Sequence, residues 1–284
     1  MEMERVMNEM KTIEDFDWAE MWNKSIEQSH WGQRSGMPEY WDGRVDWFEE
    51  LVRQSDRAGM ILSRIERKED YMVLDIGAGP GTATIPLAMI VNGVTVVEPS
   101  NGMIARLKEN ASKENLTNIA YLNKKWEDVE IGKDIEAGAY DVVIASHSLS
   151  AMKDIKTALV KMNNASKGSV YIFIIAGRRN EKDGKSLWSL FNREKTGIRP
   201  DYICLYNILY KLGIYANVEI IHAYHNRRFC DIDAAVQHYK TYMTVSGDDE
   251  ERLRLYLSEN LVEENDAFFL RHKMRTAMIS WRKE

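Results

Sequence analysis

The most informative stretch of the chain is Val73-Leu74-Asp75-Ile76-Gly77-Ala78-Gly79-Pro80-Gly81-Thr82. An apolar strand is predicted to end in a glycine-rich turn, with a helix beginning at Thr82. Glycine at alternate positions lets the backbone turn sharply and lets a ligand approach where a Cβ would clash. The free N–H groups of the helix can bind a carboxylate or a phosphate. The stretch therefore predicts a ligand-binding turn at the carboxyl end of a strand.

A dinucleotide-binding turn is the first alternative. Its fingerprint has glycines at the first, third and sixth positions, whereas the sixth position here is Thr82. Asp75 lies two residues before the first glycine, where its charge would repel a pyrophosphate and attract an ammonium group. The turn thus favours a ligand that carries an amine, a carboxylate and a ribose.

The chain from Tyr71 onward alternates short β-branched runs with helical stretches, which is typical of an α/β doubly wound parallel sheet. Ligands of such sheets bind beyond the carboxyl ends of the strands. Helices are predicted to begin near Thr82, Asn101, Lys153 and Pro200. Strands are predicted near 71–76, 94–98, 119–122, 141–145, 170–175 and 218–222, with a last strand within 271–281.

Two segments outside the alternating pattern are predicted to be helical. Residues 1–66 contain Pro38 at a first helical turn and five of the eight tryptophans. An insertion around 226–269 contains predicted helices at 231–243 and 248–263. We expect both segments to form a helical lid over the carboxyl edge of the sheet. The alternative is that they only cover apolar sheet edge.

Composition excludes several classes of protein. The 284 residues carry a net charge of −6, which argues against nucleic acid as a partner. The longest apolar run, residues 170–176, is far shorter than the ~20 residues of a membrane span, and the amino end does not resemble a signal peptide. Two cysteines, Cys204 and Cys230, support neither a disulfide scaffold nor a four-ligand zinc site. We expect a soluble cytoplasmic protein that holds no metal and does not bind membranes. The oligomeric state is left open.

Further candidate contacts follow the next two predicted strands. Glu98 ends the second strand about 20 residues after the turn, where an acid can accept both hydroxyls of a ribose. Met103 is placed to lie against an adenine face, or is ordinary core. Trp126 can stack on the adenine edge, and Asp128 can accept from its amine. The alternative for Glu127 and Asp128 is a solvated turn that caps a helix.

Four short runs together resemble the class I S-adenosylmethionine-dependent methyltransferases. They are DIGAGPGT at 75–82, EPS at 98–100, WED at 126–128 and YDVVIASHSL at 140–149. The resemblance covers roughly residues 70–180 and implies a Rossmann-like, seven-stranded sheet with an antiparallel last strand, forming a methyltransferase domain over 67–284. It implies S-adenosyl-L-methionine as cofactor and S-adenosyl-L-homocysteine as product. The implied cofactor-binding residues are Asp75, Gly77, Ala78, Gly79, Gly81, Thr82, Glu98, Pro99, Met103, Trp126, Glu127, Asp128 and Ser146.

His147 is the candidate catalytic base, because it follows the fourth predicted strand beside the expected position of the methyl group. Its ordinary pKa of ~6.5 leaves it able to accept a proton at neutral pH. The alternative is a loop histidine with one structural hydrogen bond. His30, Tyr40 and Trp41 are candidate substrate contacts, together with His147; the alternative for the aromatic residues is packing within the lid.

Motifs that the sequence lacks narrow the range of possible methyl acceptors. The strand end Ala145-Ser146-His147 has no Asn-Pro-Pro-Tyr turn, and no Pro-Cys pair stands in the right place, so two classes of nucleic-acid methyltransferase are excluded. A small molecule or a protein side chain remains. In the segment 221–228, alternate residues would face opposite sides of any strand, so only one of Arg227 and Arg228 can point inward. An inward arginine would imply an anionic acceptor. The alternative is a solvated outer face for the arginine side chains.

The leading hypothesis is an enzyme that transfers a methyl group to a small-molecule acceptor by in-line displacement, without a metal. The alternative is a non-catalytic protein that binds S-adenosylmethionine or S-adenosylhomocysteine and serves regulation or assembly. Nicotinamide-dependent oxidoreduction is a third reading, disfavoured by the glycine spacing. The sequence does not identify the acceptor or the atom that is methylated.

Overall fold

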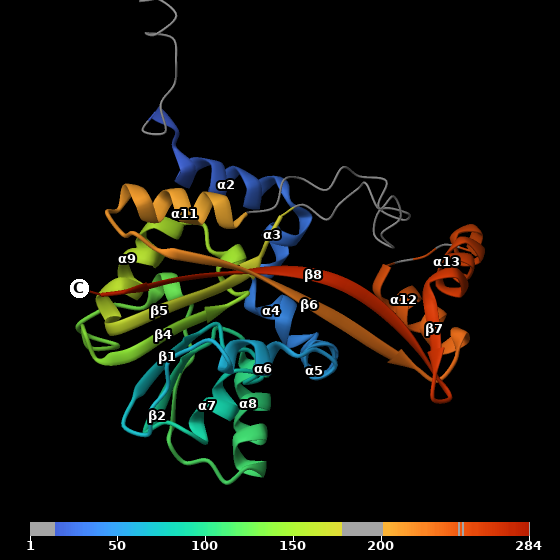
Figure 1. The fold of residues 1–284 in the computed structure, drawn as a ribbon, viewed down its shortest axis with the longest axis horizontal. Helices are drawn as coiled ribbons and strands as arrows, with labels where there is room; N and C mark the ends of the chain where they lie inside the picture. Colours follow the sequence, from blue (N-terminus) through green and yellow to red (C-terminus); the bar gives the residue numbers. More distant parts are fainter. Residues whose placement is uncertain (1–14, 178–200, 244, 246, 284) are drawn as a thin grey trace, which may run out of the picture.

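A mixed β-sheet runs through the centre of the computed structural model, which describes residues 15–177, 201–243, 245 and 247–283 (Figure 1). The strand order is β3-β2-β1-β4-β5-β8-β6, and the short β7 pairs with β8. Pairings from β3 to β5 are parallel, whereas β8 is antiparallel to β5 and β6. The predicted doubly wound sheet with an antiparallel last strand is confirmed. The bounds are Met72–Ile76 (β1), Gly93–Val97 (β2), Ile119–Leu122 (β3), Tyr140–Ser146 (β4), Ser166–Ile175 (β5), Asn217–Phe229 (β6), Leu261–Glu264 (β7) and Ala267–Arg282 (β8).

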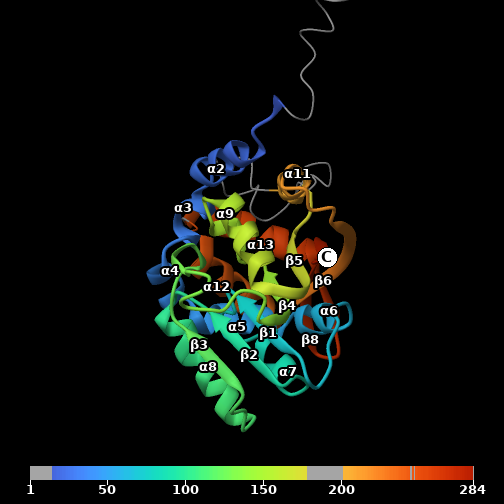
Figure 2. The same ribbon diagram turned by 90° about the vertical axis from the view of Figure 1, so that its left-hand side faces the viewer.

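Helices cover both faces of the sheet (Figure 2). Successive strand residues point to opposite faces, so Leu74 and Val143 belong to one buried cluster while Val73 and Val142 belong to the other. The first cluster includes side chains of α2, α9 and α11, and the second includes side chains of α6, α7 and α8. These helices are Trp18–Gln28 (α2), Arg57–Leu62 (α6), Thr84–Ala88 (α7), Asn101–Lys113 (α8), Ile155–Ala165 (α9) and Tyr202–Lys211 (α11).

The helix predicted to begin at Thr82 begins two residues later. The helix is assigned from Thr84, although the Ile85 N–H already donates to the Gly81 carbonyl at 2.9 Å, so the turn at 81–84 leads directly into α7. The helix after β2 begins at Asn101 as predicted, where the Ser100 hydroxyl caps it by accepting from the Met103 N–H at 3.1 Å. None of the helices in the described ranges combines the length and the apolar character that crossing a membrane requires.

Strands β6 and β8 continue beyond the sheet as a two-stranded ribbon. Pairing of β5 with β8 stops at Ile175 and Thr276, whereas β6 and β8 stay paired as far as Phe229 and Phe268. The strands predicted at 218–222 and 271–281 are therefore too short. An isolated hairpin is marginally stable in water, so the end of this ribbon needs a core of its own.

That core is supplied by two helices and β7 at the tip of the ribbon (Figure 1). The helices are Ile232–Met243 (α12) and Gly247–Asn260 (α13). The helix predicted over 248–263 ends at Asn260, because residues 261–264 pair with β8 as β7. We call the described part of residues 227–270 the distal unit. Its buried side chains are Phe229, Ala235, Val236, Tyr239, Leu253, Tyr256, Leu257 and Leu270.

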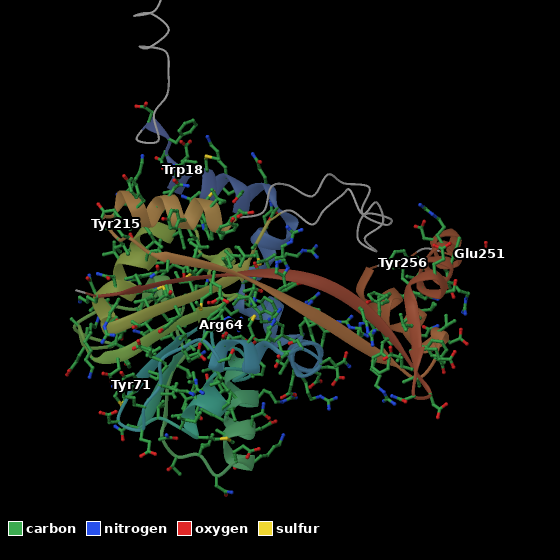
Figure 3. The ribbon with its side chains drawn as sticks, viewed as in Figure 1. Trp18, Arg64, Tyr71, Tyr215, Glu251 and Tyr256 are labelled. Atoms are coloured by element: carbon green, nitrogen blue, oxygen red, sulfur yellow. The ribbon has the colours of Figure 1, made fainter. Side chains whose placement is uncertain are left out.

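The amino-terminal segment is helical and crosses from one face of the sheet to the carboxyl edge. It comprises α2, His30–Ser35 (α3), Pro38–Asp42 (α4) and Val45–Arg53 (α5), with Pro38 in the first turn of α4 as predicted. Trp22 of α2 is fully buried, and its Nε1 donates to the Met152 carbonyl at 2.8 Å. Figure 3 shows α2, marked by Trp18, packed alongside α11 on the outside of the sheet. This part of the segment belongs to the core.

Candidate functional site

The glycine turn is held in a left-handed backbone conformation and packed from two sides. Gly77 and Gly79 have φ values of +72° and +57°, which side chains with a Cβ rarely adopt. A Cβ on Gly77 would lie 2.3 Å from the Cβ of Ser148, whose hydroxyl donates to the Ile76 carbonyl at 2.7 Å. The turn after β1 and the loop after β4 are therefore in direct contact, as expected for neighbouring parallel strands.

Asp75 lies below the turn and is buried. Its carboxylate accepts a hydrogen bond from the Thr84 hydroxyl at 2.6 Å. The pKa of Asp75 is raised to about 7, chiefly by burial and to a lesser degree by the nearby Glu98, against the opposing effect of the Thr84 hydrogen bond. A positive charge placed close to this carboxyl would favour its ionised form, which suits the amine predicted for the ligand.

Glu98 joins the end of β2 to the glycine turn. One carboxylate oxygen accepts from the Gly79 N–H at 2.9 Å, and the other accepts from the Ser100 N–H at 2.9 Å. Burial raises the pKa of Glu98, and these two backbone donors oppose that shift. Each oxygen keeps a second lone pair, so the carboxylate can still accept from the hydroxyls of a ribose.

The amino-terminal helices cover this edge. Asp42, the last residue of α4, accepts from the Ser100 hydroxyl at 2.6 Å and from the Gly102 N–H at 2.8 Å, so it caps α8 from outside. Phe48 of α5 lies over the turn, with its ring 3.5 Å from the position of a Cβ on Gly79. Arg106 of α8 pairs with Asp46 at 2.5 Å, which ties α5 to this edge.

The turn after β3 divides its side chains between the core and the surface. The Trp126 ring is buried, and its Nε1 donates to the Ala158 carbonyl of α9 at 3.1 Å. Glu127 and Asp128 are exposed, and Lys161 donates to the carbonyls of Trp126 and Glu127 at 2.5 and 2.9 Å. The Trp126 indole thus serves the core, and we propose no stacking of this ring on adenine.

The end of β4 presents Ser146 and His147, both half-buried. The His147 N–H donates to the Phe173 carbonyl at 2.7 Å, which keeps β4 and β5 paired up to the edge. His147 then takes a left-handed φ of +57°, a conformation uncommon for a residue with a side chain. A strained backbone at the carboxyl end of a strand is typical of functional positions.

The other predicted cofactor contacts surround the same turn. Ala78, Gly79 and Gly81 are buried, whereas Gly77 and Thr82 are partly exposed. Pro99 is partly exposed, and Met103 is buried on α8 with 2% of its surface exposed. The structure thus brings the residues after β1, β2 and β4 together at one carboxyl edge, as the sequence predicted. The described residues contain no cluster of three or more side chains suited to bind a metal.

Comparisons with known proteins also indicate a methyltransferase. A family model described as a methyltransferase domain matches residues 73–168, which hold the glycine turn, Glu98 and His147. An uncharacterized protein of Haemophilus influenzae is 32% identical over 213 residues, covering 74% of this chain and 75% of that protein. A putative methyltransferase from Bacillus halodurans superposes with a TM-score of 0.55 at 12% identity, covering 80% of this chain and 99% of that one. The chain belongs to the class I S-adenosylmethionine-dependent methyltransferases.

A shorter similarity concerns an rRNA methyltransferase. The 23S rRNA (uracil(1939)-C(5))-methyltransferase RlmD of Xanthomonas euvesicatoria is 44% identical over 57 residues. This stretch is 20% of this chain and 13% of RlmD. The similarity therefore concerns a short segment and leaves most of RlmD unmatched.

Apart from His147, the predicted substrate residues of this methyltransferase lie in the helices above the edge. Trp41 donates through Nε1 to the Ser35 carbonyl at 2.8 Å, and its ring meets Phe48 edge-on at 5.3 Å between centroids. The Arg44 guanidinium stacks 4.0 Å from the Tyr40 ring centroid. His30 begins α3, but its side chain lies outside the described part of the structure. Tyr40 and Trp41 thus form an aromatic cluster with Phe48.

We call the carboxyl edge formed by the glycine turn, Glu98 and His147 the cofactor edge. Sequence reasoning missed Asp42 and Phe48, which contact Ser100 and Gly79 at this edge. Asp42 contacts Ser100 across 58 positions of the chain, and no local pattern reports such a pairing. One signal was present for Phe48: it follows Trp41 at helical spacing within the tryptophan-rich segment.

Proposed function

We propose that this protein transfers a methyl group from S-adenosylmethionine to a small-molecule acceptor by in-line displacement. The observation that carries the proposal is the shared carboxyl edge: the glycine turn, the Glu98 carboxylate and the half-buried His147 follow neighbouring parallel strands. In-line transfer needs chiefly that acceptor and methyl group be held in line, and positioning contributes up to about 7–11 kcal/mol.

The residues present fit this cofactor. Gly77 and Gly79 carry no Cβ beside the strand end, where the methionine part would bind near Asp75. Glu98 would accept from the ribose hydroxyls, while the exposed Glu127 and Asp128 lie on the turn where adenine is expected. When bound, the cofactor supplies an activated methyl group on a positively charged sulfur.

His147 is proposed to accept a proton from the acceptor when the methylated atom is an oxygen, nitrogen or sulfur that carries hydrogen. Its place at the end of β4, half-buried and next to the glycine turn through Ser148, supports this role. A His147→Ala variant is expected to lower kcat about 100-fold or more while binding S-adenosylhomocysteine as the wild type does. His222, an exposed histidine on β6, provides the matched control as His222→Ala. Equal kcat for wild type and His147→Ala across pH would remove His147 from the chemistry.

A small acceptor is favoured because helices α4 and α5 cover the edge with Tyr40, Trp41 and Phe48. We propose that these helices, with His30 at the start of α3, form the lid that encloses the acceptor. A covered edge and a net charge of −6 both disfavour a large polyanion.

Ribosomal RNA is the second candidate acceptor, favoured by the short similarity to RlmD. A binding protein without catalysis is the third possibility, because an intact cofactor edge would serve binding alone. These three possibilities differ in which fraction receives the methyl group of labelled S-adenosylmethionine.

The experiment supplies the purified protein with methyl-labelled S-adenosylmethionine and, separately, a small-molecule extract, a protein extract or total RNA. The proposal expects label in the small-molecule fraction, and less label with Glu98→Ala when the cofactor concentration is limiting. Label in RNA or protein instead would overturn the choice of acceptor. Binding of S-adenosylhomocysteine without transfer to any fraction would support the non-catalytic reading.

A further inference from the structure

A cavity of about 230 Å³ separates helix α5 from the distal unit. Figure 1 shows α5 and α12 bordering this region from opposite sides, with the ribbon of β6 and β8 between them. Its volume is below the ~300–1,000 Å³ usual for drug-sized ligands, so an occupant would be small. The lining residues are Trp47, Glu50, Leu51, Gln54, Arg227, Arg228, Phe229, Ala234 and His238.

Helix α5 separates this cavity from the cofactor edge. Trp47, Glu50 and Leu51, at helical spacing, face the cavity, whereas Phe48 faces Gly79. A helix with its side chains is about 10–12 Å across, and methyl transfer requires reacting atoms about 3–3.5 Å apart. A ligand in the cavity is therefore too far away to receive the methyl group, and the cavity is a separate site.

The charged residues of the lining are Arg227, Arg228 and Glu50. Successive residues of a strand point to opposite faces, and Arg227 contacts His238 of the lining whereas Arg228 is exposed, so Arg227 is the arginine that faces the cavity. Among the side chains that the structure describes, Arg227 and Arg228 form no ion pair. Glu50 is the one acid in the lining, and its carboxylate accepts from Arg53 at 3.1 Å and also from Gln54. That carboxylate pairs with Arg53 on its own helix and also interacts electrostatically with Arg227. Arg227 is the cation that an anion in the cavity would meet.

His238 holds Arg227 in place without cancelling its charge. Arg227 donates through Nη1 to His238 Nε2, and its guanidinium lies 5.7 Å from the Tyr239 ring centroid. Burial and the adjacent Arg227 lower the pKa of His238 to about 4, so its imidazole is neutral near pH 7. Since Arg227 has five N–H donors, others stay available to an anion.

The remaining lining is apolar and partly flat. Trp47 and Leu51 line one side and Phe229 and Ala234 the other, and the Phe229 ring stands edge-on to His238 at 5.6 Å between centroids. We propose that this cavity binds a small carboxylate with a flat apolar body, its carboxylate on Arg227 and its body between Trp47 and Phe229. The proposal does not depend on the methyl transfer proposed above.

The test uses benzoate as probe and isothermal titration calorimetry on the full-length protein saturated with S-adenosylhomocysteine. Wild type is expected to bind benzoate and to bind the neutral analogue benzamide about tenfold more weakly or worse. Arg227→Gln is expected to weaken benzoate about tenfold or more. The matched control is Arg252→Gln, the same charge change on α13 at an exposed arginine paired with Asp249.

A second variant, Ala234→Phe, fills the cavity without changing charge and should abolish benzoate binding. Circular dichroism verifies that each variant is folded. Equal binding of benzoate and benzamide, or full benzoate affinity in Ala234→Phe, would overturn the proposal. So would competition between benzoate and S-adenosylhomocysteine in the unsaturated protein, because the two sites are placed on opposite sides of α5. Each of these binding measurements can be interpreted even if the protein transfers no methyl group.

Discussion

The cofactor edge lies at the carboxyl ends of the parallel strands, and the distal unit lies at the end of the ribbon that β6 and β8 form. The two regions are stabilised differently. The edge is stabilised by polar contacts between distant segments, such as Glu98 with Gly79 and Asp42 with Ser100. The distal unit is stabilised by a small apolar cluster at the tip of a ribbon, separate from the two clusters that flank the sheet. Changes in one region should therefore leave the other region's properties intact, and the predictions below test that separation.

The largest effect is expected at Gly77. A Gly77→Ala change places a Cβ 2.3 Å from the Ser148 Cβ at a φ of +72°, which combines left-handed strain of about 1–2 kcal/mol with an overpacking cost of about 1–3 kcal/mol. We expect the free energy of unfolding to fall by about 2–5 kcal/mol, and binding of S-adenosylhomocysteine to be lost. Urea denaturation and calorimetry measure the two effects.

Gly138→Ala is the matched control for Gly77. Gly138 has a φ of +64° with no atom within 4 Å of the added Cβ, so the change pays only the strain. Equal loss of stability in both variants would show that the contact with Ser148 does not hold the turn.

A smaller effect is expected from Val236→Ala in the distal unit. Val236 is fully buried in the distal cluster, and removing two methyl groups costs about 1.6 kcal/mol or more. We expect an earlier unfolding transition of the distal unit with unchanged affinity for S-adenosylhomocysteine. Val143→Ala, the same change at a fully buried site in the parallel sheet, should instead shift the main transition. A weaker cofactor affinity in Val236→Ala would contradict the separation of the two regions.

The last effect depends on pH and concerns Asp75. Because burial raises its pKa from the usual 3.8 to about 7, the folded protein keeps a proton that the unfolded chain releases in this interval. The contribution of the Asp75 proton to the free energy of unfolding is therefore full below pH 4. It falls as pH rises towards 7, by at most about 1.4 kcal/mol per pH unit. Asp75→Asn should lack this decline when unfolding is measured by urea at several pH values. The exposed Asp70→Asn is the control, and parallel curves for wild type and Asp75→Asn would disprove the buried titration.

The sequence predicts the cofactor half of the fold because its signals are local. Strand alternation, the glycine turn before Thr82 and the acid at Glu98 each lie within a few residues of the feature that they specify. The turn could be placed, and the start of α7 only to within two residues, because helix ends are not sharply defined by local sequence.

Contacts between residues far apart in the chain could not be predicted from local sequence patterns. Residue type makes Trp126 a plausible ring for stacking, yet the direction of its side chain is set by packing on Ala158 in a helix far along the chain. The length of the ribbon was also hidden, because alternation over 223–229 does not reveal a partner at 268–274. The cavity depends on α5 and β6 meeting, which no local pattern reports.

The central claim is that the edge formed by the glycine turn and Glu98 binds S-adenosylmethionine. Its most direct test is calorimetric titration of S-adenosylhomocysteine into wild type, Glu98→Ala and Val236→Ala. We predict one binding site in wild type, affinity weakened by about 1.5–3 kcal/mol in Glu98→Ala, and wild-type affinity in Val236→Ala. Undiminished affinity in Glu98→Ala would contradict the claim.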